Sequence, residues 1–354
     1  MTHTAPAQLT VVIGENIVDL VPDPTQDGDP TRDGDPTRDG DPTRDGDADV
    51  LYRAHPGGSP ANVAVTLAQL GSRGALAARV SQDVFGKRVR ARLAAAGVER
   101  RYLIDAVEPS SLAVVTFDAE RRASYDFWLN GTADWQWREG ELPNPLDDEV
   151  AAVHIGSLAA YLPPGAEVIE KLIAREGYRG RVTLSFDPNI RPTIVAAPDG
   201  SLDAARARTE RLVRLVDVVK VSDEDLGWLY PDSPAEDAAA EWAEIGPALV
   251  VMTRGPEGAL AIGRAATVNV PAPAVTVADT IGAGDSFAGA LLHALGVRGL
   301  LGPGGADRIA GLDAETLTAV IRTATTTAAL TCTRVGAIPP TAAELEAALK
   351  AFDG

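Results

Sequence analysis

Hydrophobic residues gather along this chain in short runs that alternate with longer stretches of helical periodicity. The short runs are apolar at nearly every position, which is typical of strands buried on both faces. Six such runs are predicted to be strands: Leu9–Gly14, Gly74–Val80, Val150–Gly156, Arg181–Asp187, Asp217–Val221 and Ala248–Thr253. Seven stretches are predicted to be helices: Pro60–Leu70, Phe85–Ala96, Pro164–Glu176, Leu202–Val216, Ala235–Ile245, Ala283–Leu295 and Ala314–Leu330. The alternation predicts an α/β protein with a mostly parallel sheet covered on both sides.

Three segments depart from this alternation. Val18–Val21, Leu51–Ala54 and Ala113–Leu129 have strand character with no helix between neighbouring strands, so we expect a small separate sheet. Aromatic residues cluster in and after the third segment: Tyr125, Phe127, Trp128, Trp135 and Trp137. They are consistent either with a minor hydrophobic core or with a lid over a substrate.

Residues 27–47 contain three copies of Asp-Gly-Asp-Pro-Thr-Arg and part of a fourth. Because the segment has almost no apolar residue, it cannot bury a core, and 26–47 are predicted to be a disordered insertion. The aspartate spacing that starts at Asp29 resembles the beginning of a calcium-binding loop. Gly40 stands at the twelfth position, where a bidentate glutamate belongs, so calcium binding is disfavoured.

Composition narrows the classes of function. The chain has 354 residues, of which 45% are hydrophobic, and no apolar run is long enough to span a membrane. The absence of a secretory pattern near Met1 and the single cysteine, Cys332, favour the cytoplasm. The net charge of −18 argues against nucleic-acid or anionic-membrane partners. An anionic substrate would therefore need backbone amides and a few placed cations.

The strongest local signal is the segment 277–289, where an apolar stretch runs through glycines into an amphipathic helix. The amides of Gly282, Ala283 and Gly284 are expected to form an anion hole at the helix N-terminus. Asp285 lies in the first turn, where a carboxylate can take a proton from an attacking hydroxyl. The alternative interpretation is that Asp285 only caps an ordinary strand–helix turn.

A second signal is the segment 55–64. Ser59 is a candidate N-cap with Pro60 at the first helical position, and Gly57 and Gly58 permit close approach of a ligand. Asn62 in the first turn carries both a donor and an acceptor, which suits sugar hydroxyls. The alternative for Asn62 is a local capping bond.

Together, in this order, the two segments resemble the two signature regions of the ribokinase-like carbohydrate kinase family, most closely its fructokinase-like members. The resemblance runs from about Leu9 to Ile338. It implies a single kinase domain over 1–354 with a three-layer α/β/α fold and a small β-sheet lid. The lid would comprise about 16–22, 48–55 and 113–130, and the nucleotide site would lie within about 181–345.

The resemblance also implies roles for individual residues on the sugar and phosphate side. The segment 14–19 resembles the first strand of the family, so Asp19 would bind sugar hydroxyls. The segment 186–192 resembles the fructokinase form, which would place Asn189 near phosphates and magnesium. Arg191 would stabilise the transferred phosphoryl group, or else pair with a structural carboxylate.

On the nucleotide side, the segment 253–258 resembles the family's ATP-binding segment, which assigns Thr253, Gly255 and Gly258 to ATP. Lys220 and Ser222 belong to a segment that falls where the family has its magnesium motif. Asp225 takes the place of that motif's glutamate, and this shorter carboxylate would reach magnesium through water.

Glu224, in the same segment, could substitute for Asp225 as the carboxylate that faces magnesium. Asp279 matches the family's monovalent-cation site, which implies potassium.

These features predict an enzyme that transfers the γ-phosphoryl group of ATP, with Mg²⁺, to a primary hydroxyl of a free sugar, and they favour D-fructose. A 2-keto-3-deoxygluconate kinase or a ribokinase-type activity remains open, and Arg121 and Arg122 are lid candidates for a carboxylated substrate. A sugar sensor without catalysis is the alternative from another class, but it would be expected to lose Asp285 or the glycines. The resemblance also allows a homodimer formed through lid strands.

Overall fold

The computed structural model describes residues 8–22, 51–117, 123–195 and 201–352. The predicted disordered insertion at 26–47, with its calcium-like spacing, lies outside the described residues. The two candidate arginines of the lid, Arg121 and Arg122, also lie outside them.

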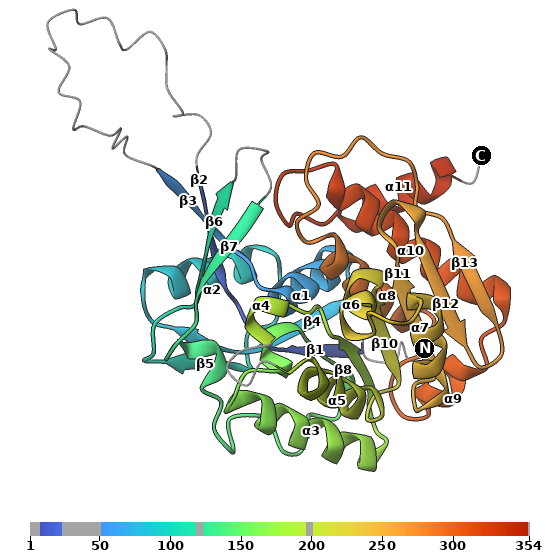
Figure 1. Ribbon diagram of the computed structural model, residues 1–354, viewed down its shortest axis with the longest axis horizontal. Coiled ribbons are helices and arrows are strands. Elements are labelled where there is room, and N and C mark those ends of the chain that lie inside the picture. The colour runs from blue at the N-terminus through green and yellow to red at the C-terminus, as the bar shows by residue number, and fades with distance from the viewer. Residues whose placement is uncertain (1–7, 23–50, 118–122, 196–200, 353–354) are drawn as a thin grey trace, which may run out of the picture.

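A nine-stranded sheet forms the centre of the molecule (Figure 1). Its strands are β1 (Leu9–Ile13), β4 (Arg73–Ser81), β5 (Leu103–Ala106), β8 (Val150–Gly156), β9 (Thr183–Asp187), β10 (Val218–Ser222), β11 (Leu249–Thr253), β12 (Ala259–Gly263) and β13 (Thr267–Val270). The spatial order is β13-β12-β11-β10-β9-β8-β1-β4-β5. All neighbours pair in parallel except β11 with β12 and β12 with β13. The predicted mostly parallel sheet is confirmed.

Strand β1 shows why the central strands are apolar at every position. Val11 and Ile13 pack into the core on one face of the sheet, whereas Val12 packs into the core on the other face. Because successive side chains point to opposite faces, a strand covered by helices on both sides needs apolar residues throughout.

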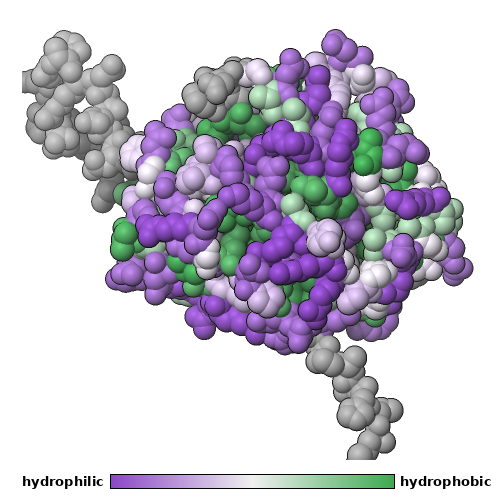
Figure 2. All heavy atoms as spheres, turned by 90° about the horizontal axis from the view of Figure 1, so that it is seen from below, coloured by the Kyte–Doolittle hydropathy of each residue, from purple (hydrophilic) through white to green (hydrophobic). Residues whose placement is uncertain are grey.

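Helices cover both faces of this sheet, which confirms the three-layer α/β/α fold. One core contains buried residues of α3 (Gly165–Arg179), α5 (Leu202–Val213), α6 (Asp223–Leu229) and α7 (Ala235–Glu244). The opposite cores contain residues of α1 (Ser59–Gln69), α2 (Val84–Ala95), α8 (Ala283–Val297), α9 (Gly305–Ala310), α10 (Ala314–Cys332) and α11 (Ala342–Phe352). Figure 2, the view from the side of α3, shows a mainly hydrophilic surface with separate small hydrophobic patches.

A second sheet stands apart from the main body, at the upper left of Figure 1. Its strands are β2 (Val18–Pro22), β3 (Tyr52–Pro56), β6 (Leu112–Phe117) and β7 (Ala123–Trp128), in the order β3-β2-β6-β7. Strand β2 pairs antiparallel with β3 and parallel with β6. The predicted small sheet is therefore present.

The sequence did not predict every element. The short strands β5, β12 and β13 were missed, as were α6, α9, α11 and the four-residue helix α4 (Pro192–Val195). Among the described residues there are also three short 3₁₀ turns: Ala133–Trp135, Ser157–Ala160 and Gly255–Glu257. The prediction of Ser59 as N-cap was wrong, because Gly58 occupies that position and Ser59 is already helical. No helix in the part of the chain that the structure describes could cross a membrane.

Candidate active site

The predicted site residues gather where several parallel strands end. The predicted residues Ser222 and Thr253 are the last residues of the neighbouring strands β10 and β11, and Asp187, which the sequence did not single out, is the last residue of β9. Because parallel strands end at the same edge of a sheet, their following loops form one crevice, which is the usual ligand site of open α/β sheets.

Helix α8 begins with the glycine segment. Its N-cap, Gly282, has φ 75°, and a β-carbon there would lie 2.5 Å from the Ala337 side chain. Glycine is therefore required both by conformation and by space. The amide of Ala283 donates to the Thr280 carbonyl at 3.2 Å, whereas helix geometry leaves the amides of the following residues directed out of the first turn. Asp285 lies beside them and is only 8% exposed.

The glycine pair before α1 leaves space for the lid. A β-carbon on Gly57 would lie 2.6 Å from the Asp19 carboxylate, and one on Gly58 would lie 2.7 Å from the Glu15 carbonyl. Gly58 also has φ 89°. Substituting either residue would push the Asp19 strand away, so the pair holds Asp19 of β2 close to the start of α1.

Asn62 joins the two predicted halves of the site. Its side-chain nitrogen donates to Asp285 Oδ2 at 2.7 Å, across the interface between α1 and α8. Asn189 approaches the other oxygen, Oδ1, at 3.5 Å. The two signature segments, more than 200 residues apart in sequence, therefore meet at a single carboxylate.

Arg191 lies next to Asn189 and is engaged with the backbone there. Its Nη1 donates to Asn189 Oδ1 at 2.7 Å and to the Ile190 carbonyl at 3.2 Å. Asn189 has φ 38°, a left-handed conformation that few residues other than glycine adopt. Arg191 thus stabilises an unusual turn at the end of β9 and keeps its charge near the site.

Arg92 of α2 also reaches this site, although the sequence did not single it out. Its Nη2 donates to Asn62 Oδ1 at 2.8 Å and to the Ala337 carbonyl at 3.2 Å. A signal for it was present, because Arg92 continues the apolar stripe of Phe85 and Val89 at helical spacing. A charged residue within a buried stripe indicates a specific buried partner.

The carboxyl group of Asp19 has an unusual environment. Burial raises the pKa of Asp19 to about 6, the Arg191 charge works against that rise, and the Asp285 carboxylate adds to it. These couplings place the three groups within electrostatic range of one another. Burial and the charge of Asp19 raise the pKa of Tyr125 in β7, and the charge of Arg191 opposes that rise. Strand β7 therefore faces the same space as these two residues.

A buried ion pair lies under the N-terminus of α8. Lys220 Nζ donates to Asp187 Oδ2 at 3.0 Å, and a β-carbon on Gly284 would lie 3.2 Å from the same Nζ. Although burial works against its charge, the surrounding carboxylates, Asp187 first, leave the pKa of Lys220 above its usual value. Asp187 Oδ1 is buried and has no hydrogen-bond partner. Asp187 was not among the predicted site residues.

The predicted magnesium segment forms a helix start. Ser222 and Asp225 make a reciprocal capping box at the N-terminus of α6. Asp225 also accepts the Ile190 amide at 2.9 Å, so its two oxygens are both engaged with backbone amides. Glu224 is exposed. In the described residues, no group of three or more His, Cys, Asp or Glu could hold a metal ion alone, so these metal roles stay predictions.

A cavity of about 530 Å³ opens on the other side of the α8 N-terminus. Three of the predicted nucleotide residues, Thr253, Gly255 and Gly258, line it together with Gly284. The remaining wall is largely apolar and includes Val275, Val277, Phe287, Ala328, Ala329 and Cys332. A cavity of this size and polarity is suited to a flat aromatic base whose phosphates extend toward the amides of α8.

The predicted monovalent-cation residue stands beside this cavity. Asp279 accepts the Ile281 amide at 3.0 Å on one oxygen and the Gly336 amide at 2.8 Å on the other. It therefore ties the segment before α8 to the loop that contains Ala337. Its role toward potassium stays a prediction.

A model of the family described as pfkB family carbohydrate kinase matches residues 10–344. The chain belongs to this family. Among curated relatives, the fructokinase of Rhizobium leguminosarum bv. trifolii is 34% identical over 266 residues, which cover 75% of this chain and 78% of the relative.

Two solved structures resemble this pfkB-family kinase over nearly its whole length. The fructokinase of Vibrio cholerae O395, solved with fructose, ADP and calcium ion, is 30% identical and superposes with a TM-score of 0.75. The matched region covers 97% of this chain and 99% of the Vibrio cholerae chain. The ATP-bound fructokinase of Xylella fastidiosa has a TM-score of 0.83 at 24% identity and covers 98% and 99%. At this sequence identity, the resemblance to the Xylella fastidiosa structure shows that the two proteins share a fold.

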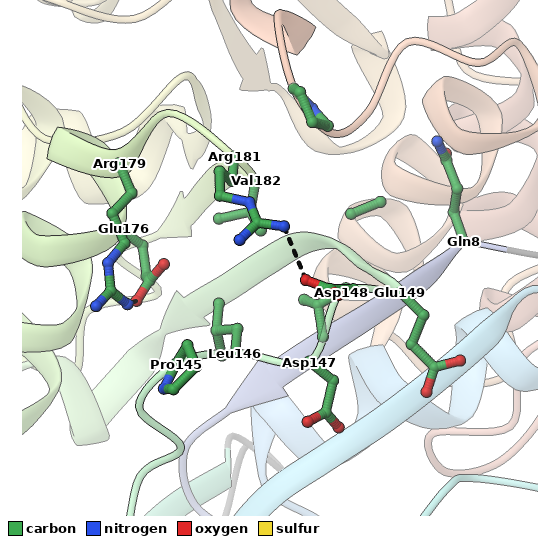
Figure 3. A pocket seen from close by; sticks show the side chains of 13 residues that line it. Gln8, Pro145, Leu146, Asp147, Asp148, Glu149, Glu176, Arg179, Arg181 and Val182 are labelled. Carbon is green, nitrogen blue, oxygen red and sulfur yellow. Dashed lines mark hydrogen bonds and ion pairs between the residues drawn. The ribbon is translucent and has the colours of Figure 1, made fainter.

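A different hollow of about 480 Å³ lies at the opposite edge of the kinase sheet (Figure 3). It includes Val150 and Val182, which lie at the amino ends of β8 and β9. The Arg181 guanidinium donates a hydrogen bond to the Asp148 carboxylate at 2.8 Å, so these two charges already neutralise each other. The hollow contains none of the residues that the sequence predicts for the site.

A buried polar floor lies under the turn that leads to Asp19, and the sequence did not reveal it. Asp134 Oδ1 accepts the backbone and side-chain amides of Asn16, both at 2.8 Å. Glu15 accepts the Ala159 amide at 3.1 Å. These bonds fix the turn between β1 and β2, which leads directly to Asp19.

Proposed function

We propose that this carbohydrate kinase transfers the γ-phosphoryl group of ATP to a primary hydroxyl of D-fructose and forms fructose 6-phosphate. The observation that carries the proposal is the 2.7 Å hydrogen bond from Asn62 to Asp285. It joins the helix start that faces the lid to the helix start that faces the nucleotide cavity. The fructokinase relatives support fructose, and the Vibrio cholerae fructokinase, which binds fructose and ADP together, supports this pair of substrates.

The sugar would lie between the lid and the start of α1. Asp19, ionised above about pH 6, would accept hydrogen bonds from sugar hydroxyls. Asn62 already donates to Asp285 and would guide a hydroxyl toward the same carboxylate. Gly57 and Gly58 let Asp19 and the turn before β2 lie against the start of α1, so they would keep Asp19 beside the sugar.

The nucleotide would occupy the cavity lined by Thr253, Gly255 and Gly258. Its phosphates would extend toward Gly284, where helix amides and the Lys220 charge favour an anion. Magnesium on nucleotide phosphates keeps several waters and needs only one or two protein carboxylates. The unpartnered Asp187 Oδ1 fits such a cation, with Asp225 or Glu224 contributing through water. A bound cation would neutralise phosphate charge there.

The chemistry requires a base, an anion hole and alignment. Asp285 would take the proton of the attacking hydroxyl, and the α8 N-terminus from Gly282 to Gly284 would hold the transferred phosphoryl group. Arg191 and Asn189 lie close enough to add charge and a hydrogen bond at the same place. Most of the rate enhancement would come from this positioning and electrostatic stabilisation.

Three further properties belong to the same proposal. Potassium would bind beside Asp279 and order the loop before α8. The edges of the small sheet at β3 and β7 would pair two lids in a homodimer. The enzyme would act in the cytoplasm, because a single cysteine without a disulfide partner suits a reducing compartment.

A coupled assay of ADP release tests the substrate. The purified chain is assayed with magnesium and potassium against fructose, ribose, 2-keto-3-deoxygluconate, glucose and adenosine. We expect fructose to give the highest kcat/KM. A higher value for another sugar would overturn fructose and leave the kinase intact, whereas binding without turnover of any sugar would support a sensor.

A further inference from the structure

Arg92 connects three segments that lie far apart in the sequence. It projects from α2, and its Nη2 reaches Asn62 of α1 at 2.8 Å and the Ala337 carbonyl at 3.2 Å. Ala337 in turn lies against Gly282, the N-cap of α8. A single guanidinium therefore connects the helix that faces the sugar with the loop that supports the anion hole.

The contact with Asn62 decides which way that amide points. A carboxamide has an oxygen that accepts and a nitrogen that donates, and the two can exchange by rotation of the group. Arg92 can only donate, and an ionised Asp285 can only accept. With Arg92 on Oδ1, the nitrogen of Asn62 must face Asp285, as the 2.7 Å bond shows. The reverse orientation would set oxygen against carboxylate and nitrogen against guanidinium.

The charge of Arg92 also fits this place. Burial lowers the pKa of Arg92, and the carboxylates of Asp285 and Asp19 oppose that change. An arginine stays charged even so, because its pKa starts far above neutrality. The desolvation cost of burying the guanidinium is thus offset by two nearby carboxylates and two hydrogen-bond acceptors.

We propose that Arg92 is a positioning residue of the kinase reaction, which fixes the Asn62 amide toward Asp285 and holds Ala337 against the α8 N-terminus. Arg92 acts through its contacts with Asn62 and the Ala337 carbonyl. The role rests on the proposed function only in taking Asp285 as the base. A plain structural strut between α2 and the Ala337 loop is the competing role, and it predicts a loss of stability without a specific loss of kcat.

The test compares Arg92→Met with a matched control on the same helix. Arg88→Met removes an exposed arginine one turn earlier and is expected to keep wild-type kcat. Arg92→Met is expected to lower kcat by about tenfold to a hundredfold, with fructose and ATP KM changed by less than about threefold. An unchanged kcat with a lowered Tm would assign Arg92 to the strut role and overturn the proposal.

A double-mutant cycle shows whether Arg92 acts through Asn62. In an Asn62→Ala background, Arg92→Met should lower kcat by a clearly smaller factor than in the wild-type background, since the residue that Arg92 orients is gone and only its contact with Ala337 remains. Equal losses in both backgrounds would overturn the proposal. Arg92→Lys keeps the charge without the planar fork and should recover part of kcat, and the same cycle with lysine serves if Arg92→Met fails to fold.

The sugar used in these assays is the one that wild-type enzyme phosphorylates fastest. If fructose is not that sugar, the proposal of fructose as substrate is overturned, but the double-mutant cycle of Arg92 and Asn62 can still be measured with the sugar that is phosphorylated. If Asp285→Asn retains full turnover, the base assignment fails, and the orientation of Asn62 then has no catalytic meaning. The two failures are therefore distinguishable.

Discussion

Asp285 is held by side chains from two distant parts of the chain. Asn62 donates to one oxygen at 2.7 Å, and Asn189 approaches the other at 3.5 Å. Both are uncharged amides, so the carboxylate is oriented without being neutralised by a directly bonded cation. A general base benefits from this arrangement, because its lone pairs are aimed while its charge remains available for a proton.

Asp19 supplies a pH-dependent prediction at the same scale. Burial raises its pKa to about 6, so the carboxylate that we propose accepts sugar hydroxyls is increasingly protonated as pH falls below 6. If fructose needs the ionised form, its dissociation constant should rise about tenfold between pH 7.5 and pH 5. Calorimetric titration of fructose measures this directly.

The matched control for that titration is Asp19→Asn, which cannot ionise. It should bind fructose more weakly than wild type at pH 7.5 and show little further change down to pH 5. A wild-type dissociation constant that stays flat over this range would contradict the role of Asp19.

At the scale of elements, the site depends on two helices whose N-cap residue is a glycine, which has no side chain. Helices α1 and α8 both begin at a glycine with positive φ, Gly58 at 89° and Gly282 at 75°. In both cases a β-carbon would strike backbone or a neighbouring side chain at less than 3 Å. The glycines therefore set the distance between each helix start and the segment that covers it.

Gly282→Ala tests the α8 start. The new β-carbon would meet Ala337 at 2.5 Å, so the loop must move away from the α8 N-terminus, and, if that terminus holds the phosphoryl group as proposed, kcat should fall about tenfold or more. Gly71→Ala is a matched control, because Gly71 also has positive φ, at 82°, but has no atom within 4 Å of the new carbon. Both variants should lose about 1–2 kcal/mol of stability from backbone strain. Equal kcat in the two would contradict the account of α8.

At the scale of the whole molecule, the buried polar floor affects stability. Glu15 is 1% exposed, and burial raises its pKa to about 7. Below pH 4.5, the pKa of Glu15 in the unfolded chain, the side chain is protonated in both the folded and the unfolded state, so its ionisation does not change the free energy of unfolding. As pH rises from 4.5 to 7, the unfolded chain ionises first, so wild-type stability decreases.

Glu15→Gln removes this penalty and can still accept the Ala159 amide. Its stability relative to wild type should increase from pH 5 to pH 8 by up to about 3 kcal/mol. Thermal unfolding of both proteins at the two pH values measures the difference, with exposed Glu167→Gln as control. A Tm difference that is the same at both pH values would contradict the buried, protonated state of Glu15.

The sequence predicted the parts of this kinase that local chemistry determines. Buried strands, the α8 start at Gly282 and the position of Asp285 in its first turn all follow from residues close together in the chain, whereas the α1 start was placed one residue too late, at Ser59. Arg92 could not be assigned a partner, because its contacts depend on how α2 docks beside α1 and the Ala337 loop. The capping box of Ser222 and Asp225 has a local signature, serine followed three residues later by an acidic residue, whereas a magnesium role for this segment rests on the family resemblance and stays a prediction.

The most direct test of the central claim is the turnover of Asp285→Asn with fructose and magnesium-ATP. Asparagine keeps the shape of the side chain but cannot take a proton, so kcat should fall by at least about a hundredfold. The fructose dissociation constant of the variant should remain close to that of wild type. Turnover equal to wild type would contradict the assignment of Asp285 as the base and, with it, the account of how this site transfers a phosphoryl group.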